Sequence, residues 1–157
     1  MASKKRRNAA KRRAGKMTKV LVPVDGSEFS DRALDYAIEL AKSQGPLELH
    51  LLSVQIPIDS GHARMFATDA EIEAYHRDEG MKVLQPYIER LEAAGIGYTY
   101  HVLVGHVAQT IARFAKEQKF EKVVMGTHGR SGLTNLLLGS VAQNVIRRLK
   151  IPVALVK

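Results

Sequence analysis

Residues 19–42 read KVLVPVDGSEFSDRALDYAIELAK, and two different hydrophobic patterns follow one another within this stretch. Residues 19–24 form a short, valine-rich apolar run, which is typical of a buried strand. Asp25-Gly26-Ser27 interrupts the run. The apolar residues that follow recur at the spacing of one helical face, namely Ala33, Leu34, Ala37, Ile38 and Ala41. The stretch therefore predicts a strand, a tight turn and an amphipathic helix.

The same succession of strand and helix is repeated along the rest of the chain. Further strands are expected at residues 47–54, 98–104, 122–125 and 153–156, and further helices at residues 69–94, 107–115 and 141–149. Residues 56–68 show no clear period and contain Pro57 and Gly61, so we expect a loop there. Pro86 is expected to weaken, kink or split the long helix. Alternating strands and helices predict one doubly wound α/β domain, a parallel sheet with helices on both faces.

The composition is that of a soluble globular protein. Of the 157 residues, 45% are apolar and 25% are charged, which is enough for one domain with a core. No apolar run reaches the ~20 residues of a membrane-spanning helix. The absence of cysteine excludes disulfides and cysteine-ligated zinc and fits a cytoplasmic location. The six histidines are not spaced as a ligand cluster with carboxylates, so no metal centre of that kind is predicted.

The net charge of +8 is concentrated at the N-terminus. Residues 1–16 hold eight lysines and arginines and no acid, which leaves 16 basic residues against 16 acidic ones in the rest of the chain. We therefore expect residues 1–17 to be a basic, disordered tail and residues 18–157 to be the folded domain. The tail is open to three interpretations: a nonspecific contact with nucleic acid or an anionic surface, a solvated solubility tail, or a segment that precedes the natural start at Met17.

A second stretch, residues 123–141 (VVMGTHGRSGLTNLLLGSV), indicates the chemistry. A buried strand is followed by Gly126, Gly129 and Gly132, and Gly139-Ser140 then begins a helix. Phosphate binding requires exposed backbone N–H groups, close approach without a Cβ and the positive end of a helix, and this order supplies all three. Ser140 adds a hydroxyl and Arg130 a positive charge. Since glycine loops are also common for purely structural reasons, the spacing alone leaves both interpretations open.

The two stretches resemble the universal stress protein family. Gly126-x2-Gly129-x9-Gly139-Ser140 is similar to the ATP-binding signature of that family, and VLVPVDGSEFS and the ending HGRSGLTNLLLGSVAQNVIRRLKIPVALVK are similar to its usual opening and ending. The resemblance covers residues 18–157. It implies a five-stranded parallel sheet in the order 3-2-1-4-5, in which the ligand lies beyond the carboxyl ends of the strands where the order reverses.

The resemblance also implies the ligand and the residues that hold it. The cofactor is expected to be ATP, with Mg2+ as an open question, and Asp25 is expected either to hydrogen-bond the nucleotide or to orient the metal. The nucleotide-binding residues carried over by position are Pro23, Val24, Asp25, Val54, Met125, Gly126, Gly129, Arg130, Gly139, Ser140 and Val141. Val54 would meet the adenine, Met125 would pack beneath it, and the glycines with Ser140 and Val141 would hold the phosphates and ribose.

Three functions remain open at this point. The first is a regulatory, nucleotide-dependent stress-response protein. The second is a slow ATPase or phosphoryl-transfer enzyme, for which Asp25, Arg130 and His128 offer polar groups but no catalytic-loop signature is present. The third is a structural dimer that binds no nucleotide. Because an unpaired apolar edge strand is an aggregation hazard, we expect residues 153–156 to pair with a second copy in a homodimer.

Overall fold

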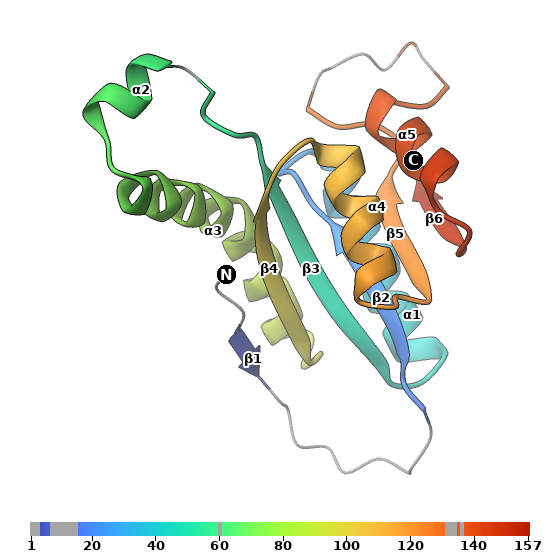
Figure 1. Ribbon diagram of the computed structural model, residues 1–157. Helices are drawn as coiled ribbons and strands as arrows, with labels where there is room; N and C mark the ends of the chain where they lie inside the picture. Colours follow the sequence, from blue (N-terminus) through green and yellow to red (C-terminus); the bar gives the residue numbers. More distant parts are fainter. Residues whose placement is uncertain (1–3, 7–15, 60, 131–134, 136) are drawn as a thin grey trace.

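The computed structural model describes residues 4–6, 16–59, 61–130, 135 and 137–157 (Figure 1). From β2 onward strands and helices alternate as the sequence predicts, except that the short helix α2 precedes α3 between β3 and β4. The elements in chain order are β1 (Lys4–Arg6), β2 (Thr18–Pro23), α1 (Glu28–Ser43), β3 (Leu47–Gln55), α2 (Gly61–Phe66), α3 (Asp69–Ala93), β4 (Tyr98–Val104), α4 (Val107–Glu117), β5 (Lys122–Gly126), α5 (Ser140–Arg148) and β6 (Val153–Val156).

The sheet has the order β1-β4-β3-β2-β5-β6. All pairings among β2 to β6 are parallel. The chain therefore runs outward from β2 through β3 to β4 and then returns to the other side of β2 for β5 and β6. This confirms the predicted five-stranded parallel sheet in the order 3-2-1-4-5, with its reversal between β2 and β5.

Helices cover the two faces of the sheet (Figure 1), and apolar side chains form a core layer on each face. On one face, α1 and α3 pack on the strands through residues such as Leu34, Leu84 and Leu91. On the other face, α4 and α5 pack through Phe114 and Val145. Burial on both faces explains why the central strands read as continuous apolar runs in place of alternating ones.

Two short elements differ from the predictions. Within the expected tail, Lys4–Arg6 forms the strand β1, which pairs antiparallel with residues 98–100 of β4. Residues 1–3 and 7–15 of the tail lie outside the described residues. Within the expected loop, Gly61–Phe66 forms the helix α2. Pro57 lies before this helix and Gly61 is its first residue, so neither interrupts it. Figure 1 shows α2 standing out from the two helical layers.

The long helix α3 runs through Pro86 without being split. Thr68 caps its start: the Thr68 hydroxyl accepts from the Glu71 N–H, and the Glu71 carboxylate accepts from the Thr68 N–H. Gly80 has a packing role, because a Cβ at this position would lie 2.4 Å from Val102 Cγ1 on β4. In the described part of the chain, no helix combines the length and the apolar character needed to cross a membrane.

Candidate functional site

The ends of β2 and β5 meet where the strand order reverses. β2 ends at Pro23, and the N–H of Val24 still donates to the Leu52 carbonyl of β3 at 2.9 Å. β5 ends at Gly126, which lies opposite Val156 of β6. Parallel strands all point their carboxyl ends to one edge, so the two turns that follow β2 and β5 share this edge.

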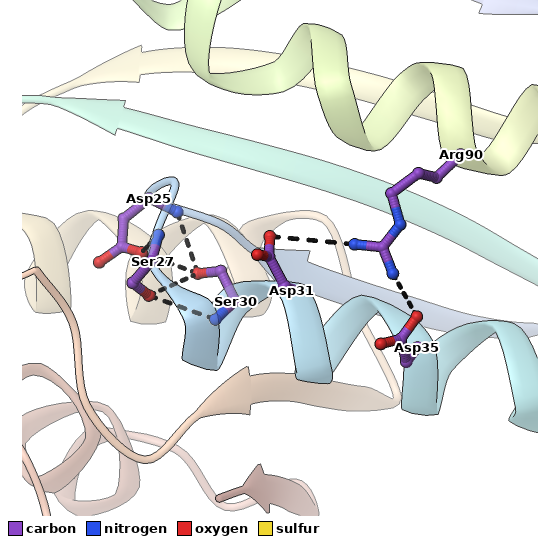
Figure 2. Close-up of polar contacts among 6 residues, drawn as sticks. All are labelled: Asp25, Ser27, Ser30, Asp31, Asp35 and Arg90. Atoms are coloured by element: carbon purple, nitrogen blue, oxygen red, sulfur yellow. Dashed lines mark hydrogen bonds and ion pairs between the residues drawn. The ribbon is translucent and has the colours of Figure 1, made fainter.

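The turn after β2 fixes the Asp25 carboxylate (Figure 2). Gly26 has φ +84°, a left-handed conformation that favours glycine and lets the chain turn directly into α1. The Asp25 Oδ1 atom accepts hydrogen bonds from the Ser27 N–H at 3.0 Å and the Ser30 hydroxyl at 2.8 Å. Ser27 is the N-cap of α1, and its Oγ accepts from the Ser30 N–H at 3.2 Å.

One backbone hydrogen bond joins the two ends of the glycine loop after β5: the Gly139 N–H donates to the Thr127 carbonyl at 2.7 Å. The Thr127 N–H donates to the Val156 carbonyl at 2.9 Å and so extends the pairing of β5 with β6. Gly139 is the N-cap of α5 and makes no side-chain capping bond, so the first N–H groups of α5 receive no cap from this residue. An uncapped helix start beside a closed glycine loop suits an anionic ligand.

Asp25 and the glycine loop face each other. A Cβ on Gly129 would lie 2.8 Å from Asp25 Oδ2, so the absence of a side chain at Gly129 leaves room for this oxygen. Asp25 and Arg130 also line one open groove of about 440 Å³, together with Gly26, Asp31, Glu79, Lys82, Val83, Pro86 and Tyr87. The groove therefore lies between the start of α1, the middle of α3 and the glycine loop, and its volume is in the range of small-molecule sites.

Tyr87 lines this groove and carries a buried hydroxyl. Its side chain is 2% exposed, and among the described residues its hydroxyl has no hydrogen-bond partner. Burial raises the pKa of Tyr87, and the nearby carboxylates of Asp31 and Asp25 raise it further, so the hydroxyl stays protonated and remains a donor. Asp31 itself lies 3.9 Å from Arg90 on α3. Figure 2 shows Arg90 bridging from α3 to Asp31 and Asp35 on α1.

The predicted site residues fall into two groups. Asp25, Gly129 and Arg130 are brought together as described, and Gly139 and Ser140 lie at the exposed or half-buried start of α5. By contrast, Val24 and Met125 are each only 5% exposed, and their side chains pack in the two core layers on opposite faces of the sheet. Val54 and Val141 are half-buried and pack against the layer formed by α4 and α5.

Three residues outside the prediction shape the same edge. Ser30 donates a hydrogen bond to Asp25. Phe29 packs against the glycine loop, since a Cβ on Gly126 would lie 2.6 Å from Phe29 Cβ. The Phe29 ring centroid also lies 5.0 Å from the ring centroid of His128. Lys82 reaches the groove from α3. The spacing Asp25-x-Ser27-x2-Ser30 is a sequence signal for Ser30, since short polar side chains at these intervals bond to the turn and the first helical N–H groups.

The family model that matches this chain is described as Universal stress protein family, and the match covers residues 16–157. The chain belongs to the universal stress protein family. One curated relative is Universal stress protein MJ0531 of Methanocaldococcus jannaschii, which is 32% identical over 141 residues, covering 88% of this chain and 81% of the relative. The family membership agrees with the resemblance found in the two sequence stretches.

Two solved structures of similar proteins share the fold. MJ0577 of Methanocaldococcus jannaschii superposes with a TM-score of 0.77 at 28% identity, over 89% of this chain and 95% of that one. A universal stress protein solved in complex with cAMP superposes with a TM-score of 0.65 at 30% identity, over 89% of this chain and 97% of that one. Within the described residues, no group of three or more histidine, aspartate or glutamate side chains is placed to hold a metal ion.

Proposed function

We propose that the protein binds an adenine nucleotide, with ATP as the preferred ligand, at the edge where β2 and β5 end. The observation that carries this proposal is the meeting of the Asp25 carboxylate with the closed glycine loop at the reversal of the strand order. A similar protein has been solved with cAMP, which supports a nucleotide as the class of ligand. An uncapped α5 and the exposed Arg130 would balance the charge of the phosphates.

We expect the two turns to contact different parts of the ligand. Gly129, Gly139 and Ser140 with Arg130 would hold the phosphates beside the start of α5. Asp25, with the backbone of Pro23 and Val24, would meet the nucleoside, since a carboxylate repels an uncompensated phosphate. Val54 is proposed as the contact for adenine. The alternative role for Asp25 is to hold Mg2+ beside the phosphates in place of contacting the nucleoside, because carboxylate and phosphate oxygens are the preferred ligands of Mg2+.

We propose a regulatory role for this binding, in a homodimer. Ligand contacts on both turns would favour one arrangement of the glycine loop over others, which is a shift of populations that a partner protein can detect. In the described sheet, β6 is the last strand beyond β5, so its outer side is available to a second copy. The lack of cysteine in the sequence fits a reducing cytoplasm as the place of action.

The basic N-terminal segment supports a second, independent proposal: a nonspecific contact with nucleic acid. Eight lysines and arginines lie within residues 1–16, and β1 places three of them along the sheet edge opposite β6. Phosphate contacts of this kind weaken steeply with salt. A chain that starts at Met17 should lose this affinity for duplex DNA, while the full chain should retain it at low salt; equal affinities would exclude the segment as the contact.

The proposed nucleotide site is tested by competition. A fluorescent ATP analogue is bound to the purified protein and displaced by ATP, ADP, AMP, cAMP and GTP. We expect the adenine nucleotides to compete better than GTP, and Arg130→Ala to weaken ATP more than adenosine, since its charge faces the phosphates. Equal displacement by GTP would contradict the preference for adenine, and an Arg130→Ala variant that binds ATP normally would contradict the assignment of the loop to the phosphates.

A further inference from the structure

The two oxygens of the Asp25 carboxylate are not equivalent. Oδ1 accepts from both the Ser27 N–H and the Ser30 hydroxyl, whereas no described residue donates to Oδ2. Oδ2 instead lies 2.8 Å from the position that a Cβ on Gly129 would take. The carboxylate is thus turned so that one oxygen is bonded within the turn and the other is directed at the glycine loop.

Hydrogen bonds also fix the orientation of the Ser30 hydroxyl. The Asp25 N–H donates to Ser30 Oγ at 3.1 Å, so Oγ is the acceptor in that bond. A hydroxyl carries one proton, and Asp25 Oδ1 at 2.8 Å is a nearer acceptor for it than Ser27 Oγ at 3.4 Å. Ser30 is 5% exposed, so water does not compete freely for this bond. Figure 2 shows the three side chains of this arrangement at the start of α1.

We propose that Ser30 is a positioning residue, which holds Asp25 so that Oδ2 alone accepts a single hydrogen bond from a donor on the nucleoside part of the ligand. The terminal torsion of an aspartate is broad, so a carboxylate without these bonds rotates and presents either oxygen. The Ser30 hydroxyl removes this freedom before the ligand arrives, and preorganisation of this kind favours binding. The inference rests on the proposed nucleotide binding and deepens it.

The neighbouring Ser27 provides a matched control. Its side chain caps α1 through the Ser30 N–H, but it is the Ser27 backbone N–H that reaches Asp25 Oδ1. Ser27→Ala therefore removes a helix cap and a 3.4 Å contact with Ser30 Oγ but keeps the N–H bond to Asp25. Ser30→Ala removes both bonds between Ser30 Oγ and Asp25, the one to Oδ1 and the one from the backbone N–H. Ser30→Thr keeps a hydroxyl at position 30. A loss caused merely by a weakened helix would appear in Ser27→Ala as well.

The test is a calorimetric titration with adenosine and three analogues that each lack one donor: 2′-deoxyadenosine, 3′-deoxyadenosine and purine riboside. We expect wild type to bind one analogue about tenfold or more weakly than adenosine, which is the worth of a hydrogen bond to a charged group. Ser30→Ala should shrink this ratio severalfold, while Ser27→Ala and Ser30→Thr keep it. In an Asp25→Ala background, adding Ser30→Ala should change adenosine affinity no further. Circular dichroism confirms that each variant is folded at the temperature used.

The possible outcomes distinguish a failure of the Ser30 proposal from a failure of the proposed nucleotide binding. If wild type binds ATP but Ser30→Ala keeps the full ratio between adenosine and the weakest analogue, Ser30 does not position Asp25. If wild type binds ATP and all four nucleosides alike, Asp25 does not accept from the nucleoside, and the inference is overturned while the proposed function stands. If wild type binds neither ATP nor adenosine, both fail together.

Discussion

The glycines of the loop after β5 lack a side chain for different local reasons. A Cβ on Gly126 would meet Phe29, a Cβ on Gly129 would meet the Asp25 carboxylate, and a Cβ on Gly139 would lie 3.1 Å from the Thr127 carbonyl oxygen. The sequence spacing predicts the three positions but not these reasons, because the partners come from α1 and from the loop itself. Gly126 is therefore interpreted first as a packing position, and Gly129 and Gly139 as positions at the ligand site.

Gly126→Ala should lower stability. The new methyl group would stand 2.6 Å from Phe29 Cβ and 2.9 Å from the Phe29 carbonyl carbon, and the backbone of α1 must shift to accept it. Overpacking of this kind costs about 1–3 kcal/mol. Urea unfolding followed by circular dichroism measures it. Gly97→Ala is the control, since an added Cβ there meets nothing within 4 Å, and equal stabilities of the two variants would contradict the account of Gly126.

Gly139→Val should instead weaken ATP binding. The backbone at Gly139, with φ −69° and ψ 161°, is accessible to any residue, so the fold should survive. The added side chain would crowd Thr127 and His128 at the point where the loop closes on α5. We expect ATP affinity to fall by more than about tenfold in a fluorescence titration, a loss of at least ~1.4 kcal/mol. Unchanged affinity would show that the loop end does not contact the ligand.

At the scale of elements, β3 and β4 hold a pair of stacked histidines between them. His50 Nδ1 and His101 Nε2 are 2.8 Å apart, and His50 Nε2 is 2.9 Å from Glu48 Oε1. Burial lowers the pKa of His101 to about 4, and the positive charges of His50 and Lys19 act in the same direction. This pair could not be predicted from the sequence, because residues 50 and 101 meet only through the register of two strands.

The shifted pKa of His101 predicts a pH dependence of stability. In the unfolded chain the imidazole takes up a proton near its ordinary pKa of 6.5, but in the folded chain only near 4. Between these values the unfolded state binds more protons, so the free energy of unfolding should fall as the pH is lowered from about 6.5 to about 4 and then level off for this group. His101→Gln should reduce this slope in urea titrations at several pH values. The exposed His62→Gln is the control, and an unchanged slope in His101→Gln would contradict the argument.

The elements that the sequence failed to predict are the short ones. The apolar periodicity of α1, α3, α4 and α5 and the apolar runs of β2 to β6 predict their positions well, since each of these elements buries a face in the core. Only six residues make up α2, and two of them, Met65 and Phe66, leave most of their side chains exposed. β1 is set by pairing with β4, and a run of lysines and arginines carries no signal for such pairing.

At the scale of the whole molecule, β6 is the element that the homodimer proposal depends on. The Pro152 carbonyl accepts from Val123 of β5, and the Val156 carbonyl accepts from Thr127 directly after β5. Residues along a parallel strand alternate in the side to which their backbone groups point. By this alternation, the N–H and C=O groups of Val153 and Leu155 face away from β5. These are the groups that a second copy would pair with.

Val153→Pro should therefore shift the protein from dimer toward monomer. Proline lacks the outward N–H, and it is tolerated at the first residue of a strand, which Val153 is. Val153→Ala is the matched control, because it also loses side-chain packing but keeps the N–H. Sedimentation velocity over a range of concentrations distinguishes the states. A monomeric wild type would contradict the proposed dimer, and a Val153→Pro dimer as stable as that of Val153→Ala would exclude the β6 edge as its interface.

The central claim is that the edge shared by β2 and β5 binds ATP, and a calorimetric titration tests it most directly. The protein is first stripped of any copurified nucleotide and is then titrated with ATP, with and without Mg2+. We expect saturable binding that approaches one ATP per chain, and its loss in Gly139→Val. The absence of binding to the stripped, folded protein would contradict it, and would mean that the glycines after β5 serve only the packing of the loop against α1 and α5.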